Sequence, residues 1–188
     1  MTLPTIDPGA AVFLDRDGVI NNNHEDYILS WDQLQLLPGS LTALTKLAQT
    51  NYTIVVVTNQ SAIGRGLIKV DAAREINDRL IACIEQCNGR IDGLYLCPHA
   101  PYDHCECRKP KTGLLLQAAQ ELNINLNRSW LVGDAITDLQ AGISAGAQSI
   151  LVHTGRGTSQ SSLCTPQILA HVVEMADLAA AVDYILAH

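Results

Sequence analysis

Five short apolar runs, separated by polar and helical segments, are the feature that most constrains how this chain can fold. Apart from Ser149 at the start of the last run, each run is apolar at successive rather than alternate positions, as strands of a parallel sheet covered on both faces require. The sequence therefore predicts five buried parallel strands. The runs are Ala10–Leu14, Ile54–Val57, Leu94–Leu96, Trp130–Val132 and Ser149–Val152.

Helical patterns alternate with these runs. A segment over Ser40–Thr50 begins at a Pro-Gly signal and keeps Leu41, Leu44 and Leu47 on one side. Strands that alternate with helices in this way predict an α/β fold with a doubly wound, Rossmann-like and mostly parallel sheet. The other expected helices are Asp71–Cys87, Thr112–Leu122, Thr137–Ala145 and Asp177–Ala187.

Length and charge limit the class of protein. A chain of 188 residues suits one domain and is short for two, so we expect a single domain over residues 1–188 with its core at about residues 10–157. A composition that is 47% hydrophobic excludes a disordered chain. The net charge of −7 argues against nucleic-acid or membrane partners.

The N-terminal segment favours a cytoplasmic protein. Met1–Pro8 carries no basic residue, and the apolar run after it is soon broken by Asp15, so it resembles neither a secretion signal nor a membrane span. The six cysteines are therefore expected to remain thiols in a reducing compartment. Nothing in the sequence indicates a strong interface, so we expect a monomer.

Polar residues follow three of the predicted strands directly. They are Asp15, the pair Thr58-Asn59 and the pair Gly133-Asp134. Open parallel sheets bind ligands at the carboxyl ends of their strands, so these segments are expected to meet at one edge. Each could alone be an ordinary polar residue that ends a strand, but their joint chemistry favours a site.

The segment Asp15–Gly18 places two carboxylates two residues apart, and both face the same edge if the chain stays extended. With Asp134 they form an oxygen-rich cluster suited to Mg²⁺. One carboxylate can attack phosphorus, while the other protonates the leaving oxygen and later deprotonates water. Thr58 and Lys109 offer donors for the phosphate oxygens. Asp138 either binds the metal through water, orients Lys109, or caps a helix.

Four segments together resemble the motifs of the haloacid dehalogenase-like phosphatases, in the same order. The resemblance implies Asp15 as nucleophile, Asp17 as general acid and base, and Thr58 and Lys109 as phosphate ligands. It also implies Mg²⁺ on Asp15, Asp134 and the Asp17 carbonyl, and the second aspartate favours phosphate transfer over dehalogenation. The segments are Phe13–Val19, Val57–Gln60, Arg108–Pro110, and Gly133-Asp134 with Asp138.

A cysteine-rich segment precedes Lys109 and predicts a structural zinc site. Three thiolates and one imidazole complete a tetrahedral zinc shell and leave no place for water. Ordinary free cysteines are the alternative, and His104 is an alternative ligand. The expected ligands are Cys97, His99, Cys105 and Cys107.

The spacing of the motifs leaves no room for a cap domain. The interval from Gly18 to Thr58 holds a flap and one helix, and the interval from Thr58 to Lys109 holds one helix, one strand and the zinc loop. We therefore expect a capless enzyme with an open cleft, shaped by Asn21–Tyr27 and the zinc loop. An open cleft suits an extended or doubly phosphorylated sugar.

Within the family, the short flap, the segment Thr58–Ser61 and the zinc loop resemble the D-glycero-D-manno-heptose 1,7-bisphosphate phosphatases. Two positions differ: the flap over Asn23–Tyr27 is one residue longer than usual and begins with Asn, and Ala135 stands where Lys is common. Arg108 would hold the second phosphate, or pair with Glu106. The substrate-binding candidates are Asn23, His24, Tyr27, Asn59, Gln60, Ser61 and Arg108.

Three functions follow from these patterns. The first is removal of the 7-phosphate of the heptose bisphosphate through a phospho-aspartate intermediate. The second is hydrolysis of histidinol phosphate, because histidinol-phosphate phosphatases share much of the pattern. The third is a catalytically inactive binding module stabilised by zinc, and the intact set of acids counts against it.

Overall fold

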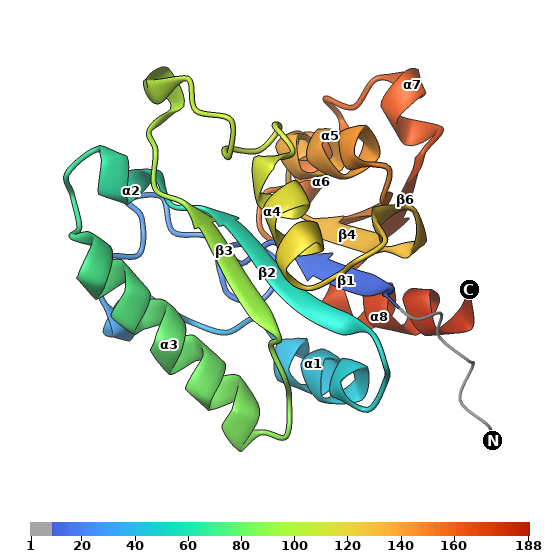
Figure 1. Ribbon diagram of the computed structural model, residues 1–188, viewed down its shortest axis with the longest axis horizontal. Coiled ribbons are helices and arrows are strands. Elements are labelled where there is room, and N and C mark those ends of the chain that lie inside the picture. The colour runs from blue at the N-terminus through green and yellow to red at the C-terminus, as the bar shows by residue number, and fades with distance from the viewer. Residues whose placement is uncertain (1–8) are drawn as a thin grey trace.

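The computed structural model describes residues 9–188, so the prediction for Met1–Pro8 lies outside the described residues. Its centre is a six-stranded sheet in the order β3-β2-β1-β4-β5-β6, in which every neighbouring pair is parallel (Figure 1). The strands are β1 Ala11–Leu14, β2 Thr53–Asn59, β3 Gly93–Cys97, β4 Trp130–Gly133, β5 Gln148–Val152 and β6 Val172–Met175.

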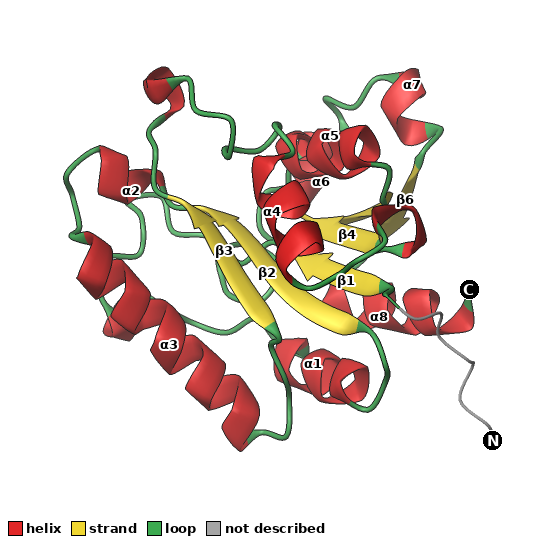
Figure 2. Cartoon of the chain, in the orientation of Figure 1, coloured by secondary structure: helices red, strands yellow, loops and turns green. Residues whose placement is uncertain are grey.

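Helices connect the strands and cover both faces of the sheet (Figure 2). Short 3₁₀ turns lie at Trp31–Gln33, Pro101–Asp103 and Leu126–Arg128. The helices are α1 Ser40–Ala48, α2 Ser61–Gly64, α3 Val70–Gln86, α4 Gly113–Glu121, α5 Ile136–Ala145, α6 Gly157–Ser161, α7 Pro166–Leu169 and α8 Leu178–Ala187.

The core has two layers because successive side chains of a strand point to opposite faces. Val12 and Leu14 of β1 pack in the cluster that includes buried residues of α1, α3 and α8. Ala11 and Phe13 pack in the cluster that includes buried residues of α4 and α5. All four side chains are fully buried, which explains why the run is apolar throughout.

The predicted fold class is confirmed. All five predicted strands and all five predicted helices are present, with bounds that differ by up to two residues. The elements missed are β6 and the short helices α2, α6 and α7. The strand β6 lies at the edge of the sheet, and none of its residues is buried, so its sequence lacks the apolar run that marks the other strands.

The topology positions the site. The chain leaves β1 at the middle of the sheet and crosses to β2 on one side and, later, to β4 on the other. The carboxyl ends of β1 and β4 therefore flank the point where the strand order reverses, which is where such sheets bind ligands. No inserted cap domain occurs within residues 9–188, and no helix there is long and apolar enough to cross a bilayer.

Candidate active site

A buried lysine connects the ends of three elements. The Lys109 Nζ lies 2.9 Å from Asp15 Oδ1 and 2.8 Å from Asp138 Oδ1, and it donates to the Val57 carbonyl at 2.7 Å. Its side chain is only 2% exposed. The ammonium group therefore uses all three protons on acceptors that come from the end of β1, from α5 and from β2.

Burial governs the protonation of this cluster. The pKa of Asp15 is raised to about 6, chiefly because burial removes the carboxylate from water; the charges of Asp138 and Asp17 add to this shift, and the attraction of Lys109 opposes it. Burial lowers the pKa of Lys109, but the two facing carboxylates outweigh it and the pKa lies above its usual value. Lys109 is therefore a fixed positive charge beside Asp15.

Asp134 forms a second charged centre beside the first. Its side chain is fully buried, and its Oδ2 accepts from Asn23 Nδ2 at 2.6 Å and from the Arg156 backbone N–H at 2.8 Å. The Arg156 guanidinium lies 3.1 Å from Asp134 Oδ1. Burial raises the pKa of Asp134, with the charge of Asp15 adding to it, while Arg156 opposes the shift.

Two glycines make room for this carboxylate. Gly18 has a φ of +88° and Gly155 a φ of +57°, and a Cβ at either position would overlap Asp134 Oδ2. Both loops thus approach Asp134 so closely that only a hydrogen fits.

The segment after β1 does not stay extended but folds back on itself. The carbonyl of Arg16 accepts from the N–H of Ile20 at 2.9 Å and of Asn21 at 3.2 Å, which folds the chain back at Gly18. Asp17 still lies close enough for its charge to act on Asp15. The bend brings the guanidinium of Arg16 onto the carboxylate of Asp17.

The residues at the end of β2, and Gln60 directly after it, hold the neighbouring groups in place. Asn59 donates to the Lys109 carbonyl and accepts from the Lys109 N–H, both at 3.1 Å. Gln60 Nε2 donates to Thr58 Oγ1 at 2.8 Å and to Asp17 Oδ2 at 3.1 Å. The Asn59 side chain, predicted to contact substrate, is thus hydrogen-bonded to the backbone of Lys109 instead.

A cavity of about 860 Å³ opens over these groups. Of the predicted site residues outside the zinc cluster, its lining includes all except Asp134, which is fully buried. Lys111 and Arg156 also line it. The lining residues from the prediction are Asp15, Asp17, Asn23, His24, Tyr27, Thr58, Asn59, Gln60, Ser61, Arg108, Lys109 and Asp138.

The open alternatives for Arg108 and Asp138 have structural answers. Glu106 forms its ion pair with Lys111, so Arg108 does not pair with it; the Arg108 guanidinium contacts the His99 carbonyl at 3.4 Å. Asp138 orients Lys109 through Oδ1 and accepts from the Ala135 N–H through Oδ2 at 3.0 Å, so it both orients the lysine and caps α5.

The carboxylate cluster fits a divalent cation. Ligand oxygens of Asp15, Asp134 and Asp138 all lie within 4.8 Å of one another, and all three residues are buried. Two cationic side chains, Lys109 and Arg156, face these three acids. The cluster thus keeps an excess of negative charge in a buried place, and hard oxygen donors of this kind suit Mg²⁺.

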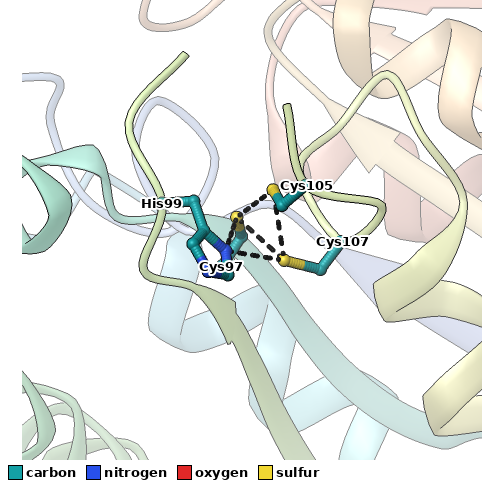
Figure 3. A group of neighbouring side chains, drawn as sticks. All are labelled: Cys97, His99, Cys105 and Cys107. Carbon is teal, nitrogen blue, oxygen red and sulfur yellow. Dashed lines mark hydrogen bonds between the residues drawn. The ribbon is translucent and has the colours of Figure 1, made fainter. Parts of the chain in front are cut away.

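The four predicted zinc ligands lie together (Figure 3). Cys107 Sγ is 3.1 Å from Cys97 Sγ, 3.5 Å from Cys105 Sγ and 3.2 Å from His99 Nδ1. Zn–S bonds of about 2.3 Å in a tetrahedron place sulfurs about 3.8 Å apart, so small shifts would admit the ion. His104 is exposed and lies outside this group.

Sequence reasoning missed Arg156 and Asn77. The segment Thr154–Gly157 follows β5 at the same edge of the sheet as the other polar segments, and this position was the available signal for Arg156. Asn77 lies in the middle of α3 and contacts Arg16, which no local pattern reveals.

Comparisons with known proteins identify the family of this chain. A model of HAD-hydrolase-like proteins matches residues 106–180. A D-glycero-beta-D-manno-heptose-1,7-bisphosphate 7-phosphatase of Neisseria meningitidis is 40% identical over 146 residues, 78% of this chain and 78% of that protein. The enzyme of that name from Haemophilus influenzae is 36% identical over 173 residues, 88% of this chain and 94% of that protein.

A crystal structure of the D,D-heptose 1,7-bisphosphate phosphatase from B. bronchiseptica, complexed with magnesium and phosphate, superposes with a TM-score of 0.89. It shares 36% sequence identity and covers 95% of this chain and 98% of its own. The chain belongs to the haloacid dehalogenase-like family, as its four motifs predicted. Within that family, the relatives named here are heptose bisphosphate phosphatases.

The crowding at Gly18 leads to a stability prediction. Gly18→Ala should lower the free energy of unfolding by about 1–3 kcal/mol more than Gly66→Ala, because the new methyl group overlaps Asp134. Gly66 is the matched control, since its φ is +72° and nothing lies within 4 Å of its Cβ position. Urea unfolding measures both, and equal losses would show that Asp134 moves aside at no cost.

Proposed function

We propose that this enzyme removes the 7-phosphate of D-glycero-D-manno-heptose 1,7-bisphosphate through a phospho-aspartate on Asp15. The chain is a phosphoric monoester hydrolase, as the relatives and the structural neighbour indicate. The observation that carries the proposal is the buried Asp15 held by Lys109 beneath the cavity. Its support is the similarity over most of the chain to phosphatases of that substrate.

In the first half-reaction, a carboxylate oxygen of Asp15 attacks phosphorus, and the bond from phosphorus to the sugar oxygen breaks. The proton of Asp17 passes to that oxygen, which leaves as an alcohol. Lys109 stabilises charge on the phosphoryl oxygens and keeps Asp15 oriented, and the Thr58 hydroxyl and nearby amides provide further donors.

In the second half-reaction, Asp17 takes a proton from water and the water oxygen attacks phosphorus. The bond between phosphorus and Asp15 breaks, inorganic phosphate leaves, and both carboxylates return to their starting states. We propose Asp15, Asp134 and the Asp17 carbonyl as the ligands of Mg²⁺. When bound there, the cation offsets negative charge on the acids and on the phosphate.

The substrate contacts are proposed from the cavity lining. Arg108 reaches the cavity from the zinc loop, and its planar fork suits the phosphate that is not cleaved. His24 and Tyr27 line the cavity from the flap, where polar side chains suit sugar hydroxyls. Asn23, Gln60 and Ser61 complete this set, while Asn59 acts through the Lys109 backbone.

Phosphate release in the presence of magnesium tests the function. The expected result is fast release from one anomer of the heptose bisphosphate, slower release from the other, and little from histidinol phosphate. Asp15→Asn should lower kcat by on the order of 10⁴-fold or more, because the nucleophile is lost.

Asp26→Asn, on the exposed flap, is the control and should keep its activity. Preference for histidinol phosphate would favour the second hypothesis. Absence of release from all three compounds would favour the inactive binding module.

We propose that Cys97, His99, Cys105 and Cys107 bind a structural Zn²⁺ that fixes the loop before Lys109. The purified wild type should contain about one zinc per chain by elemental analysis, with one closed tetrahedral site. Cys105→Ser should lose it and unfold at a lower temperature, whereas Cys164→Ser should keep it, because Cys164 lies outside the cluster. A wild type purified without chelators that lacks zinc would contradict the proposal.

We propose that the enzyme is a single-domain monomer in the cytoplasm, with a phosphorylated sugar as its small-molecule partner. None of the six cysteines forms a disulfide, as a reducing compartment favours, and the acidic chain offers little attraction to nucleic acid. Light scattering should give a mass near 20.3 kDa, and twice that mass would show a dimer instead.

A further inference from the structure

Arg16, between the two motif aspartates, has a buried side chain that contacts Asp17. Its guanidinium NH2 group donates to Asp17 Oδ1 at 2.9 Å and Oδ2 at 3.0 Å, and its Nε donates to Oδ1 at 3.2 Å. The Arg16 side chain is 3% exposed and that of Asp17 is 23% exposed. A planar guanidinium that contacts both carboxylate oxygens fixes the plane of the carboxylate as well as its position.

The other end of the guanidinium is anchored on a helix that does not line the cavity. Arg16 NH1 donates to Asn77 Oδ1 of α3 at 2.7 Å. Asn77 is 2% exposed and lies on the buried stripe of α3, with Ala73 and Leu80 near it along the helix. An arginine only donates hydrogen bonds, so the oxygen of the Asn77 amide must face it.

The buried amide of Asn77 is only partly hydrogen-bonded. Asn77 Nδ2 has no hydrogen-bond partner, although an apolar side chain at this position would bury no unpaired donor. The buried, unpaired Nδ2 of Asn77 therefore lowers the stability of the fold. What the chain gains in return is a fixed orientation for Arg16.

We infer that Arg16 and Asn77 are positioning residues that hold the Asp17 side chain in the orientation from which, once protonated, it passes its proton to the leaving oxygen. The inference rests on the proposed function, because it assumes Asp17 to be the general acid. Two further donors, Asn21 Nδ2 at 2.8 Å and Gln60 Nε2 at 3.1 Å, bind the same carboxylate. Arg16 is the member of this set that contacts both of its oxygens.

A comparison of two leaving groups can tell whether Arg16 positions the general acid or only supports the structure. A sugar alkoxide is a strong base and leaves only with a proton, whereas p-nitrophenolate leaves without one. The kcat/KM value reports formation of the phospho-aspartate, so it isolates the step in which the acid acts. Later hydrolysis of that intermediate is common to both substrates and affects kcat.

The experiment compares kcat/KM for p-nitrophenyl phosphate with that for the alkyl phosphate that the wild type hydrolyses fastest. Arg16→Met should lower the alkyl value by at least about tenfold, within the roughly 10²–10⁴-fold that a general acid contributes. The aryl value should fall by less than about threefold. Asn77→Leu should act in the same direction with a smaller loss, and Asp17→Asn should set the upper limit.

Arg90→Met is the matched control. Like Arg16, Arg90 pairs with a nearby aspartate: its Nε donates to Asp92 Oδ2 at 3.1 Å. It also donates to the Tyr52 carbonyl, away from the cavity. Its loss should change both kcat/KM values equally or not at all. If Arg16→Met does not fold, as thermal unfolding would show, Asn77→Leu carries the test.

Equal losses for both esters in Arg16→Met and Asn77→Leu, or no loss in either, would overturn the inference. Failure of the proposed function looks different. The wild type would then hydrolyse neither ester, or Asp17→Asn would lower the two kcat/KM values equally.

Discussion

The contact on which the site depends is the buried ammonium of Lys109 between Asp15 and Asp138. Two carboxylates can be buried side by side only where a cation and hydrogen bonds replace the water that they lose. Lys109 supplies the charge, and the Val57 carbonyl accepts the third hydrogen bond of its ammonium group. This group thereby holds the end of β1, the end of β2 and the start of α5 at one spacing.

The zinc loop follows from that constraint. Lys109 is two residues beyond Cys107, so the geometry of the cysteine cluster restricts the position of the Lys109 backbone. The Asn59 side chain fixes the same backbone from the other side with two hydrogen bonds. Two supports on one residue are what a buried, long and otherwise flexible side chain needs if its ammonium is to stay in one position.

The sequence predicted the parts of the site that local patterns determine. Asp15 and Asp134 follow apolar strands and Thr58 lies at the end of one, and parallel topology brings these strand ends together whatever the details of packing. Asn77 could not be found in this way, because in the pattern of α3 it only interrupts an apolar stripe. Its role depends on a contact across 61 positions, which the bend after Asp15 creates.

The charge next to Asp134 also comes from an element that its own motif does not reveal. Ala135, the residue directly after Asp134, is buried and brings no charge. Arg156 supplies the charge through its guanidinium and adds its backbone N–H, from the loop after β5. Gly18 and Gly155, which both approach Asp134 Oδ2, lie in the loops after β1 and β5. The loop after β5 therefore passes close to the carboxylate. Because Arg156 directly follows Gly155, its guanidinium reaches Asp134 from this loop and supplies the positive charge that Ala135 does not.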